Sequence, residues 1–291
     1  MCGGFFNDAE EKSLVCEKNH CFDIASKGYV NFLPNRRQES ELYNKILFES
    51  RRSVFESGVY DNVLREIDDA ILMHCKNYKG TAPKNDSDTD PNSINAKDSN
   101  EGFRKETVIL DVGCGEGYYA AGLSEKPEVT VFALDIIKDA ILASCGRKAP
   151  VNWMVADLTN IPVKTGVVDV LLNILTGANY GEFERVLKDD GVMIKVVPGG
   201  DYLKEIREAI KPQLRGKEST NSEGSSSEHF EKHMKTIDKV TLDYNFPVDE
   251  NLMNHFITMT PMTYGVDTEN LKTDGICGIT IDLEMLIGKK Q

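Results

Sequence analysis

The sequence lacks any long hydrophobic run. No stretch of about 18 consecutive apolar residues occurs in it, so we expect no helix that crosses a membrane. The N-terminus is polar and acidic after Phe6 and has no apolar core of a signal peptide. Its hydrophobic content of 40% and charged content of 28% are those of a soluble globular protein, which we expect in the cytoplasm.

A net positive charge is also missing. The formal net charge of −13 at pH 7 argues against sequence-independent coating of nucleic acid, because that binding depends on neutralising phosphates. A local basic groove stays open as an alternative. Its candidates are Arg36, Arg37, Arg51 and Arg52, although ordinary solvated charges explain these residues equally well.

The cysteines do not form an even, regularly spaced set. Seven are scattered along the chain: Cys2, Cys16, Cys21, Cys75, Cys114, Cys145 and Cys277. In a reducing compartment such cysteines indicate thiols or metal ligands and not a disulfide framework. Cys16 and His20 stand four apart, which suits two ligands of one metal, whereas Cys2 stands alone where a zinc knuckle would place two cysteines.

Composition divides the N-terminal part of the chain. Residues 1–34 are rich in Gly, Asn and Cys and end at a proline, which favours a small separate module. Residues 35–78 are predicted to be a helical linker. Within it, apolar residues recur near helical spacing over 39–76.

Two polar stretches interrupt the remainder. Residues 79–105 have almost no large apolar side chain, so they predict a disordered insertion. Residues 215–232 are similar and predict a flexible loop within a domain that spans 106–291.

A regular alternation of apolar segments fills that domain. The β-rich runs are "TVILDVG", "VTVFALD", "VNWMVAD", "VVDVLLNIL" and "VMIKVVPG", with helical segments between them. Near-continuous apolar strands that alternate with helices predict an α/β fold with a parallel sheet covered on both faces. "KVTLDYNF" and "GITIDLEMLIGKK" add two strand candidates around a helix predicted from Glu250 to Met259.

The stretch "VILDVGCGEGYYA" is the most informative. A strand ends at Asp111, and Gly113, Gly115, Glu116 and Gly117 lie in a tight turn before a helix. Glycines permit unusual backbone angles and let a ligand approach the main chain closely. The spacing is G-x-G-x-G, which differs from the dinucleotide fingerprint G-x-G-x-x-G, and the Gly-Lys-Ser/Thr of a P-loop is absent.

Two acids follow at the ends of the next two strands. Asp135 lies about 20 residues beyond the loop, where an acid can accept hydrogen bonds from both ribose hydroxyls. Asp157 ends the third strand and can accept from an adenine amino group. An adenosine without phosphates, held by a glycine loop and two acids, describes S-adenosylmethionine. Either acid taken alone is equally consistent with a helix cap or a turn.

This pattern resembles the class I methyltransferases, which implies a Rossmann-like, mostly parallel sheet of seven strands with the last antiparallel. The segments "CEKNHCFDIASKGYVNFLP", "ESRRSVFESGVYDNVL" and "DVGCGEGYY" are similar to the bacterial 23S ribosomal RNA guanine-N1 methyltransferases. The most specific parts are the H-x-F-D-x-A-x-x-G-Y-V block, the glycine loop and the run from Arg185 to Gly199. The resemblance covers nearly the whole chain except the two polar stretches.

The resemblance implies roles for particular residues. Gly115 and Glu116 match loop positions that touch the cofactor, and Tyr60 matches a tyrosine that closes over it. Tyr202 stands where the family typically has a histidine near the cofactor. Asn173 and Asn179 are candidates for contacts with the target base; for all four polar side chains, plain packing is the alternative. The catalytic base has no candidate.

The resemblance also implies a zinc-ribbon-like module that recognises RNA, a 23S rRNA hairpin as partner, and a homodimer. Its metal ligands would be Cys2, Cys16 and His20, with Cys21 or water as a fourth. Because the family's knuckle has one cysteine more, we expect that the sequence as given starts late or that one ligand has been lost. The module is therefore predicted to be incomplete, with zinc weakly bound or absent.

Two rival functions stay open at this point. One is a methyltransferase for a small molecule, which would share the glycine loop but would not need the Cys/His module. The other is a cofactor-binding or RNA-binding factor without catalysis, which the Tyr202 difference and the incomplete metal set favour.

Overall fold

The computed structural model describes residues 6–7, 12–33, 43–78, 106–214, 223–273 and 275–291. The predicted insertion at 79–105 and the predicted ligand Cys2 lie outside these residues. Within the described ranges, every helix is too short or too polar to cross a membrane.

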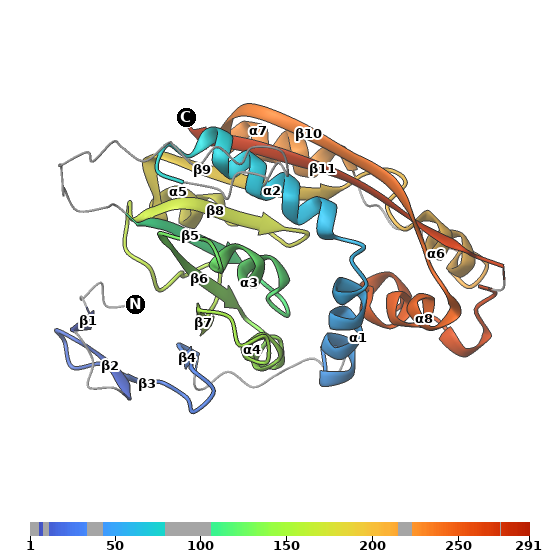
Figure 1. Cartoon of the computed structure of the whole chain (residues 1–291), viewed down its shortest axis with the longest axis horizontal. Helices are drawn as coiled ribbons and strands as arrows, with labels where there is room; N and C mark the ends of the chain where they lie inside the picture. Colours follow the sequence, from blue (N-terminus) through green and yellow to red (C-terminus); the bar gives the residue numbers. More distant parts are fainter. Residues whose placement is uncertain (1–5, 8–11, 34–42, 79–105, 215–222, 274) are drawn as a thin grey trace, which may run out of the picture.

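An eight-stranded sheet forms the centre of the molecule, in the order β10-β11-β9-β8-β5-β6-β7-β4 (Figure 1). Its strands in chain order are β4 (Tyr29–Asn31), β5 (Thr107–Val112), β6 (Val129–Asp135), β7 (Val151–Val155), β8 (Val168–Ile174), β9 (Leu187–Pro198), β10 (Met234–Pro247) and β11 (Gly278–Lys290). The last strand, β11, pairs antiparallel with both β9 and β10, as predicted. The other pairs are parallel. The predicted seven strands are confirmed, and β4 is an eighth that the sequence did not indicate.

Strand β4 connects the N-terminal module to this sheet. The module has a small antiparallel sheet of β1 (Phe6–Asn7), β2 (Ser13–Cys16) and β3 (Cys21–Asp23). β4 then pairs in parallel with β7, and Phe32 extends the contact by donating its main-chain N–H to the Val155 carbonyl (2.9 Å). The Phe32 ring packs against the rings of Phe6 and Phe22. The N-terminal module is thus joined to the eight-stranded sheet by main-chain hydrogen bonds.

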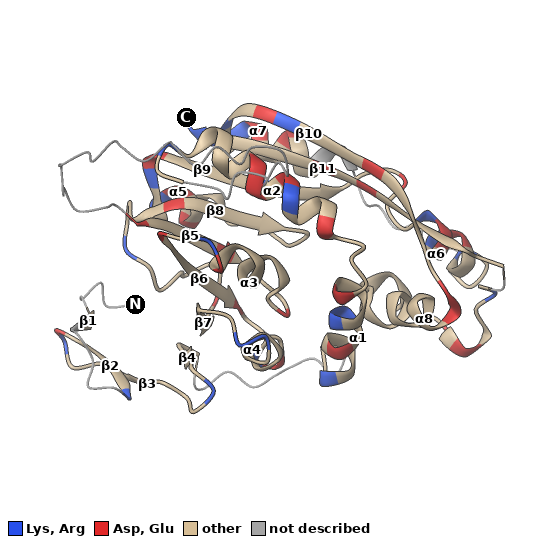
Figure 2. Ribbon diagram, in the orientation of Figure 1, with Lys and Arg blue, Asp and Glu red and all other residues tan. Residues whose placement is uncertain are grey.

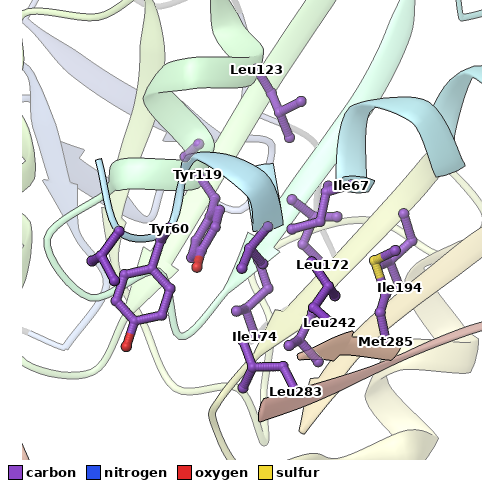
Figure 3. Close-up of a cluster of buried hydrophobic side chains, with 14 of the residues drawn as sticks. Tyr60, Ile67, Tyr119, Leu123, Leu172, Ile174, Ile194, Leu242, Leu283 and Met285 are labelled. Atoms are coloured by element: carbon purple, nitrogen blue, oxygen red, sulfur yellow. The ribbon is translucent and has the colours of Figure 1, made fainter. Parts of the chain in front are cut away.

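Two helices occupy the region predicted to be helical at 39–76. They are α1 (Lys45–Glu56), whose first turn is capped by the Asn44 side chain, and α2 (Asp61–His74). The apolar face of α2 is fully buried at Val63, Ile67 and Ile71. Figure 3 shows Ile67 among sheet residues that include Leu172 and Ile194, so α2 is part of the core. The charged residues of α1 and α2 form bands on the helix surfaces, whereas most of β8 is uncharged (Figure 2).

The remaining helices cover the sheet on both faces. They are α3 (Tyr118–Ser124), α4 (Lys138–Cys145), α5 (Tyr180–Val186), α6 (Lys204–Ile210), α7 (Glu223–His233) and α8 (Glu250–Met259), followed by 3₁₀ turns at Pro261–Thr263 and Thr268–Asn270. One apolar cluster joins α2, α3 and α8 to one face, and a second joins α5 and α7 to the other. The predicted helix from Glu250 to Met259 is confirmed as α8.

The predicted loop at 215–232 is wrong for its second half. Residues 223–232 belong to helix α7, and Phe230 on that helix is fully buried against the sheet. The contact is so close that a Cβ on Gly288 would lie 2.7 Å from the Phe230 ring. Composition misled because one buried aromatic residue and its docking surface stabilise a helix that polar neighbours would not predict.

Candidate functional site

The glycine loop between β5 and α3 requires its glycines. Gly113, Gly115 and Gly117 have φ angles of +75°, +56° and +83°, a region that other residues rarely adopt. A Cβ on Gly113 would lie 2.7 Å from the Thr176 hydroxyl, and one on Gly117 would lie 2.5 Å from the Trp153 ring. The loop is therefore shaped by both backbone angle and close packing, and it begins helix α3 at the carboxyl edge of the sheet.

Two carboxylates stand beside the loop. Asp135, at the end of β6, accepts hydrogen bonds from the N–H groups of Gly115 (3.0 Å) and Ile137 (2.8 Å). Asp111 is 2% exposed, and its Oδ2 has no hydrogen-bond partner among the described residues. Burial, followed by the charge of Asp135, raises the pKa of Asp111 to about 7. A buried carboxyl group with an unpaired oxygen beside the glycine loop is suited to a cationic or hydrogen-bond-donating ligand.

The Glu116 side chain has a different position from the predicted contact with a cofactor. It is 1% exposed, and Arg147 binds it in a bidentate pair, with Nη2 to Oε1 at 2.5 Å. Arg52 adds a third contact, Nε to Oε2 at 3.3 Å. The carboxylate thus joins α1 and α4 to the glycine loop. The main-chain carbonyl of Glu116 also accepts from Arg147 Nε (3.0 Å). Direct contact between Glu116 and a cofactor stays a prediction.

Tyr60 and Tyr202 come together although 142 residues separate them. Their hydroxyl oxygens lie 2.6 Å apart, with one donating to the other. Tyr60 is buried immediately before α2, and Tyr202 follows β9. Burial raises the pKa of Tyr202 to about 12, so both hydroxyls stay protonated at neutral pH. The two predicted cofactor-side tyrosines form one hydrogen-bonded pair.

Arg51 on α1 belongs to the same region, and sequence reasoning did not assign it to the cofactor. Its guanidinium lies over the rings of Phe48 (5.5 Å) and Tyr43 (6.0 Å), and its Nη1 would lie 3.7 Å from a Cβ on Gly115. Its charge lowers the pKa of Asp135, which burial has raised. Arg51 forms no ion pair with a carboxylate in the described part of the chain, so its charge is available to a ligand.

Asp157 has a local role in the structure. Its Oδ1 accepts from the main-chain N–H of Thr159 (2.9 Å) and from the Thr159 hydroxyl (2.7 Å). This is the turn-forming role that was the alternative to adenine binding. The predicted contact with adenine stays a prediction.

The two asparagines also have structural partners. Asn179 caps helix α5 by accepting from the N–H of Glu182 (3.1 Å). Asn173, which is fully buried, donates through Nδ2 to the Gly177 carbonyl (2.9 Å) and accepts through Oδ1 from Lys195 Nζ (2.5 Å). Contact of either side chain with a target base is therefore still a prediction, and for Asn173 it would require rearrangement.

Lys195 is a second functional candidate that the sequence did not indicate. It stands in β9, is 4% exposed, and has no carboxylate partner within the described ranges. Burial lowers the pKa of its amine to about 8. The signal that could have found it is a lysine inside the otherwise apolar run "VMIKVVPG".

Half of the predicted metal site is visible. Cys16 Sγ and His20 Nδ1 lie 3.3 Å apart, a separation that suits two ligands of one tetrahedral ion. Cys16 is buried, whereas Cys21 is exposed on β3. Groups of three or more possible ligands do not occur among the described residues, and Cys2 lies outside them. The Cys16–His20 pair fits a zinc ion but does not complete its coordination.

Comparisons with known proteins cover both parts of the chain. Residues 1–41 match the zinc-ribbon family described as "RlmA, N-terminal", and residues 109–191 match the family described as "Methyltransferase domain". A Bacillus subtilis (strain 168) protein named "Putative 23S rRNA (guanine-N(1)-)-methyltransferase YxjB" is 32% identical over 300 residues, which cover 100% of this chain and 95% of that protein.

A second relative comes from Streptomyces fradiae and is named "23S rRNA (guanine(748)-N(1))-methyltransferase". It is 23% identical over 90% of this chain and 84% of its own length. Among solved structures, the geranyl diphosphate C-methyltransferase of Streptomyces coelicolor A3(2) is similar at a TM-score of 0.42 with 14% identity, over 64% of this chain and 70% of that one. That likeness is too distant to carry an argument.

Proposed function

The chain belongs to the bacterial 23S rRNA (guanine-N1)-methyltransferase family, and we propose on this premise that it transfers a methyl group from S-adenosylmethionine to N1 of a guanine in 23S rRNA. The observation that carries the proposal is the glycine loop with its two acids, one of which is buried with an oxygen that has no hydrogen-bond partner among the described residues. It occurs in a chain that matches the family over its full length and retains the N-terminal module.

The charges around the loop complement those of S-adenosylmethionine. The amino-acid end of that cofactor carries an ammonium and a carboxylate group. Among the described residues, Asp111 Oδ2 has no hydrogen-bond partner and would accept from the ammonium, and Arg51 has no carboxylate partner and would bind the carboxylate. Asp135 is fixed by Gly115 at the strand end where an acid can bind ribose hydroxyls. Tyr60 and Tyr202 would close this site from α2 and from the end of β9.

The chemistry requires alignment more than activation. The bound sulfonium supplies an electrophilic methyl group, so the chain's task is to place the target atom in line with it. Guanine N1 lies on the Watson–Crick edge and carries a proton. The guanine must therefore be unstacked from its neighbours, and N1 must lose that proton. The turn 175–179, which contacts Gly113 through Thr176, lies where the base can approach the cofactor.

The N-terminal module and oligomeric state belong to the same proposal. We assign the module to recognition of a 23S rRNA hairpin, because β4 fixes it to the edge of the catalytic sheet. We assign the protein to the cytoplasm, where bacterial ribosomes are assembled, and to a homodimer by family resemblance alone.

Zinc would be held by Cys16 and His20 with ligands beyond the described residues. Elemental analysis of the purified protein measures the zinc content, and one zinc per chain is the outcome that supports a complete site.

Primer extension tests the proposed reaction directly. Ribosomal RNA from a strain that lacks this protein is incubated with the purified protein and S-adenosylmethionine. A new stop at a single guanine is expected, because methylation at N1 blocks base pairing. Omission of the cofactor is the matched control and should give no stop.

Two failures can be distinguished with calorimetry of S-adenosylhomocysteine binding. Binding without a new stop would contradict the rRNA assignment and favour a small-molecule acceptor. Absence of both binding and the stop would contradict the methyltransferase assignment and favour a non-catalytic RNA-binding factor.

A further inference from the structure

A lysine and an asparagine face each other in the interior of the sheet. Lys195 of β9 and Asn173 of β8 are register partners, and the strand segments around them, residues 192–197 and 170–174, are otherwise apolar. Both side chains are buried, at 4% and 0% exposure. A buried amine without a carboxylate partner costs free energy, and the lowered pKa of Lys195 reflects that cost. Such a pair is not explained by packing of the core.

The pair is connected to the turn that follows β8. Lys195 Nζ donates to Asn173 Oδ1 (2.5 Å) and to the Thr176 carbonyl (3.3 Å). Asn173 Nδ2 donates in turn to the Gly177 carbonyl (2.9 Å). Two successive main-chain carbonyls of the turn 175–179, those of Thr176 and Gly177, thus accept hydrogen bonds from side chains of the sheet.

The turn itself is in an unfavourable conformation. Leu175 has a φ of +51°, which is rare for a residue with a side chain, and it is 39% exposed. Its N–H nevertheless continues the ladder by donating to the Val196 carbonyl (3.0 Å). The next residue, Thr176, packs against Gly113 of the glycine loop. The network therefore fixes an exposed apolar side chain beside the cofactor loop, at the cost of backbone strain.

We propose that Lys195 is a positioning residue for the methyl acceptor: together with Asn173 it holds the turn 175–179 in the strained form that receives the target guanine. The proposal rests on the proposed function for the identity of the acceptor. It assigns no contact between Lys195 and the cofactor, because the network ends at the Thr176 and Gly177 carbonyls. Loss of the lysine should therefore affect transfer to RNA and leave cofactor binding unchanged.

Substitution Lys195→Met removes both hydrogen bonds that Nζ donates and keeps the side-chain volume similar. We expect a kcat for RNA methylation at least 30-fold lower, with a dissociation constant for S-adenosylhomocysteine within about threefold of wild type. The denaturation midpoint should stay equal or rise, because an apolar residue replaces a buried charge. Lys195→Arg, which retains donors and charge, should recover part of the lost kcat. A kcat within threefold of wild type in Lys195→Met, or a parallel loss of cofactor affinity, would overturn the proposal.

Hydrogen exchange provides a readout that does not depend on activity. In Lys195→Met, amides of residues 174–180 should exchange at least tenfold faster, while those of β5 should be unchanged. Leu175→Gly is a second variant: it relieves the φ strain and should lower kcat without faster exchange in β5 or weaker cofactor binding. If wild-type protein methylates no RNA, the proposed function fails, whereas the exchange comparison still decides the positioning role. Unchanged exchange in the turn would contradict it.

Discussion

At the residue scale, the candidate site contains charged groups that lack a full set of partners among the described residues. In the part of the chain that the structure describes, one oxygen of the buried Asp111 is unpaired, and Arg51 lies over aromatic rings and forms no ion pair. The buried, unpaired oxygen of Asp111 lowers stability unless a ligand completes its hydrogen bonding. Functional sites commonly carry such a cost, and it makes their residues identifiable from geometry.

Arg51→Ala tests whether the free cation binds the carboxylate of the cofactor. We expect S-adenosylhomocysteine affinity to fall about 10- to 100-fold, because a charge-assisted hydrogen bond is lost. Affinity for 5′-methylthioadenosine, which lacks the amino-acid end, should stay within about twofold. Isothermal titration calorimetry measures both. Lys45→Ala on the same helix, where the side chain is 85% exposed, is the control. An equal loss for both ligands would show that Arg51 only maintains the structure.

Asp111→Asn should raise stability and lower affinity. The pKa of Asp111 is raised from 3.8 to about 7, so the folded protein holds its proton more tightly than the unfolded chain. Stability of the ligand-free protein therefore falls as pH rises from about 4 to about 8, with a ceiling of about 4 kcal/mol. We expect the Asn variant to be more stable than wild type by about 1–2 kcal/mol at pH 8, with no difference near pH 4. Urea unfolding at both pH values and calorimetry with S-adenosylhomocysteine measure these effects. A variant that is less stable at pH 8 would contradict the assignment.

At the element scale, one carboxylate holds three segments together. Glu116 in the glycine loop binds Arg52 on α1 and Arg147 after α4. Arg52 also donates to the Ala143 carbonyl of α4 (2.6 Å). The loop is consequently fixed by helices on either side of it, so its shape depends on these ion pairs as well as on its glycines.

Arg147→Ala should therefore destabilise the whole fold. It removes the bidentate partner of a carboxylate with no exposed side-chain surface, and breaking a buried pair typically costs about 3–5 kcal/mol. Lys138→Ala, an exposed position on α4, should change the free energy of unfolding by less than about 0.5 kcal/mol. Guanidinium unfolding compares the two variants. A loss below about 1 kcal/mol in Arg147→Ala would mean that Arg52 alone satisfies Glu116.

At the scale of the whole molecule, the N-terminal module completes the sheet. β4 covers the β7 edge, and Tyr29, Val30 and Phe32 are buried in the contact. An uncovered edge of this kind exposes unpaired main-chain groups and promotes association between copies.

A chain that lacks residues 1–33 should unfold at a lower temperature and self-associate. We expect its thermal midpoint to fall by about 5–10 °C, because apolar contacts and a strand are lost together. Calorimetry and light scattering measure the two effects. His20→Ala, which removes a predicted metal ligand but keeps β4, is the matched control and should change the midpoint less. Equal losses in the two proteins would instead assign the stability of the module to its metal.

The sequence by itself determined the features that neighbouring residues carry. Apolar runs specified the parallel strands, and helical patterns specified α1, α2 and α8. The glycine loop indicated a candidate ligand site, because periodicity and backbone freedom are local properties. The predicted cofactor contacts of Tyr60 and Tyr202 came from family resemblance, since 142 residues separate the two.

Tertiary structure decided which polar groups remain free for a ligand. Glu116 and Asn173 had been predicted as contacts to cofactor and base, yet each is occupied by a distant basic side chain. Arg51 and Lys195 showed no local pattern and gained their significance only from neighbours brought in by folding. The same holds for β4 and α7, whose short or polar sequences are stabilised by the surfaces on which they dock. Long-range contacts set these outcomes because burial and pairing depend on the whole fold and not on adjacent residues.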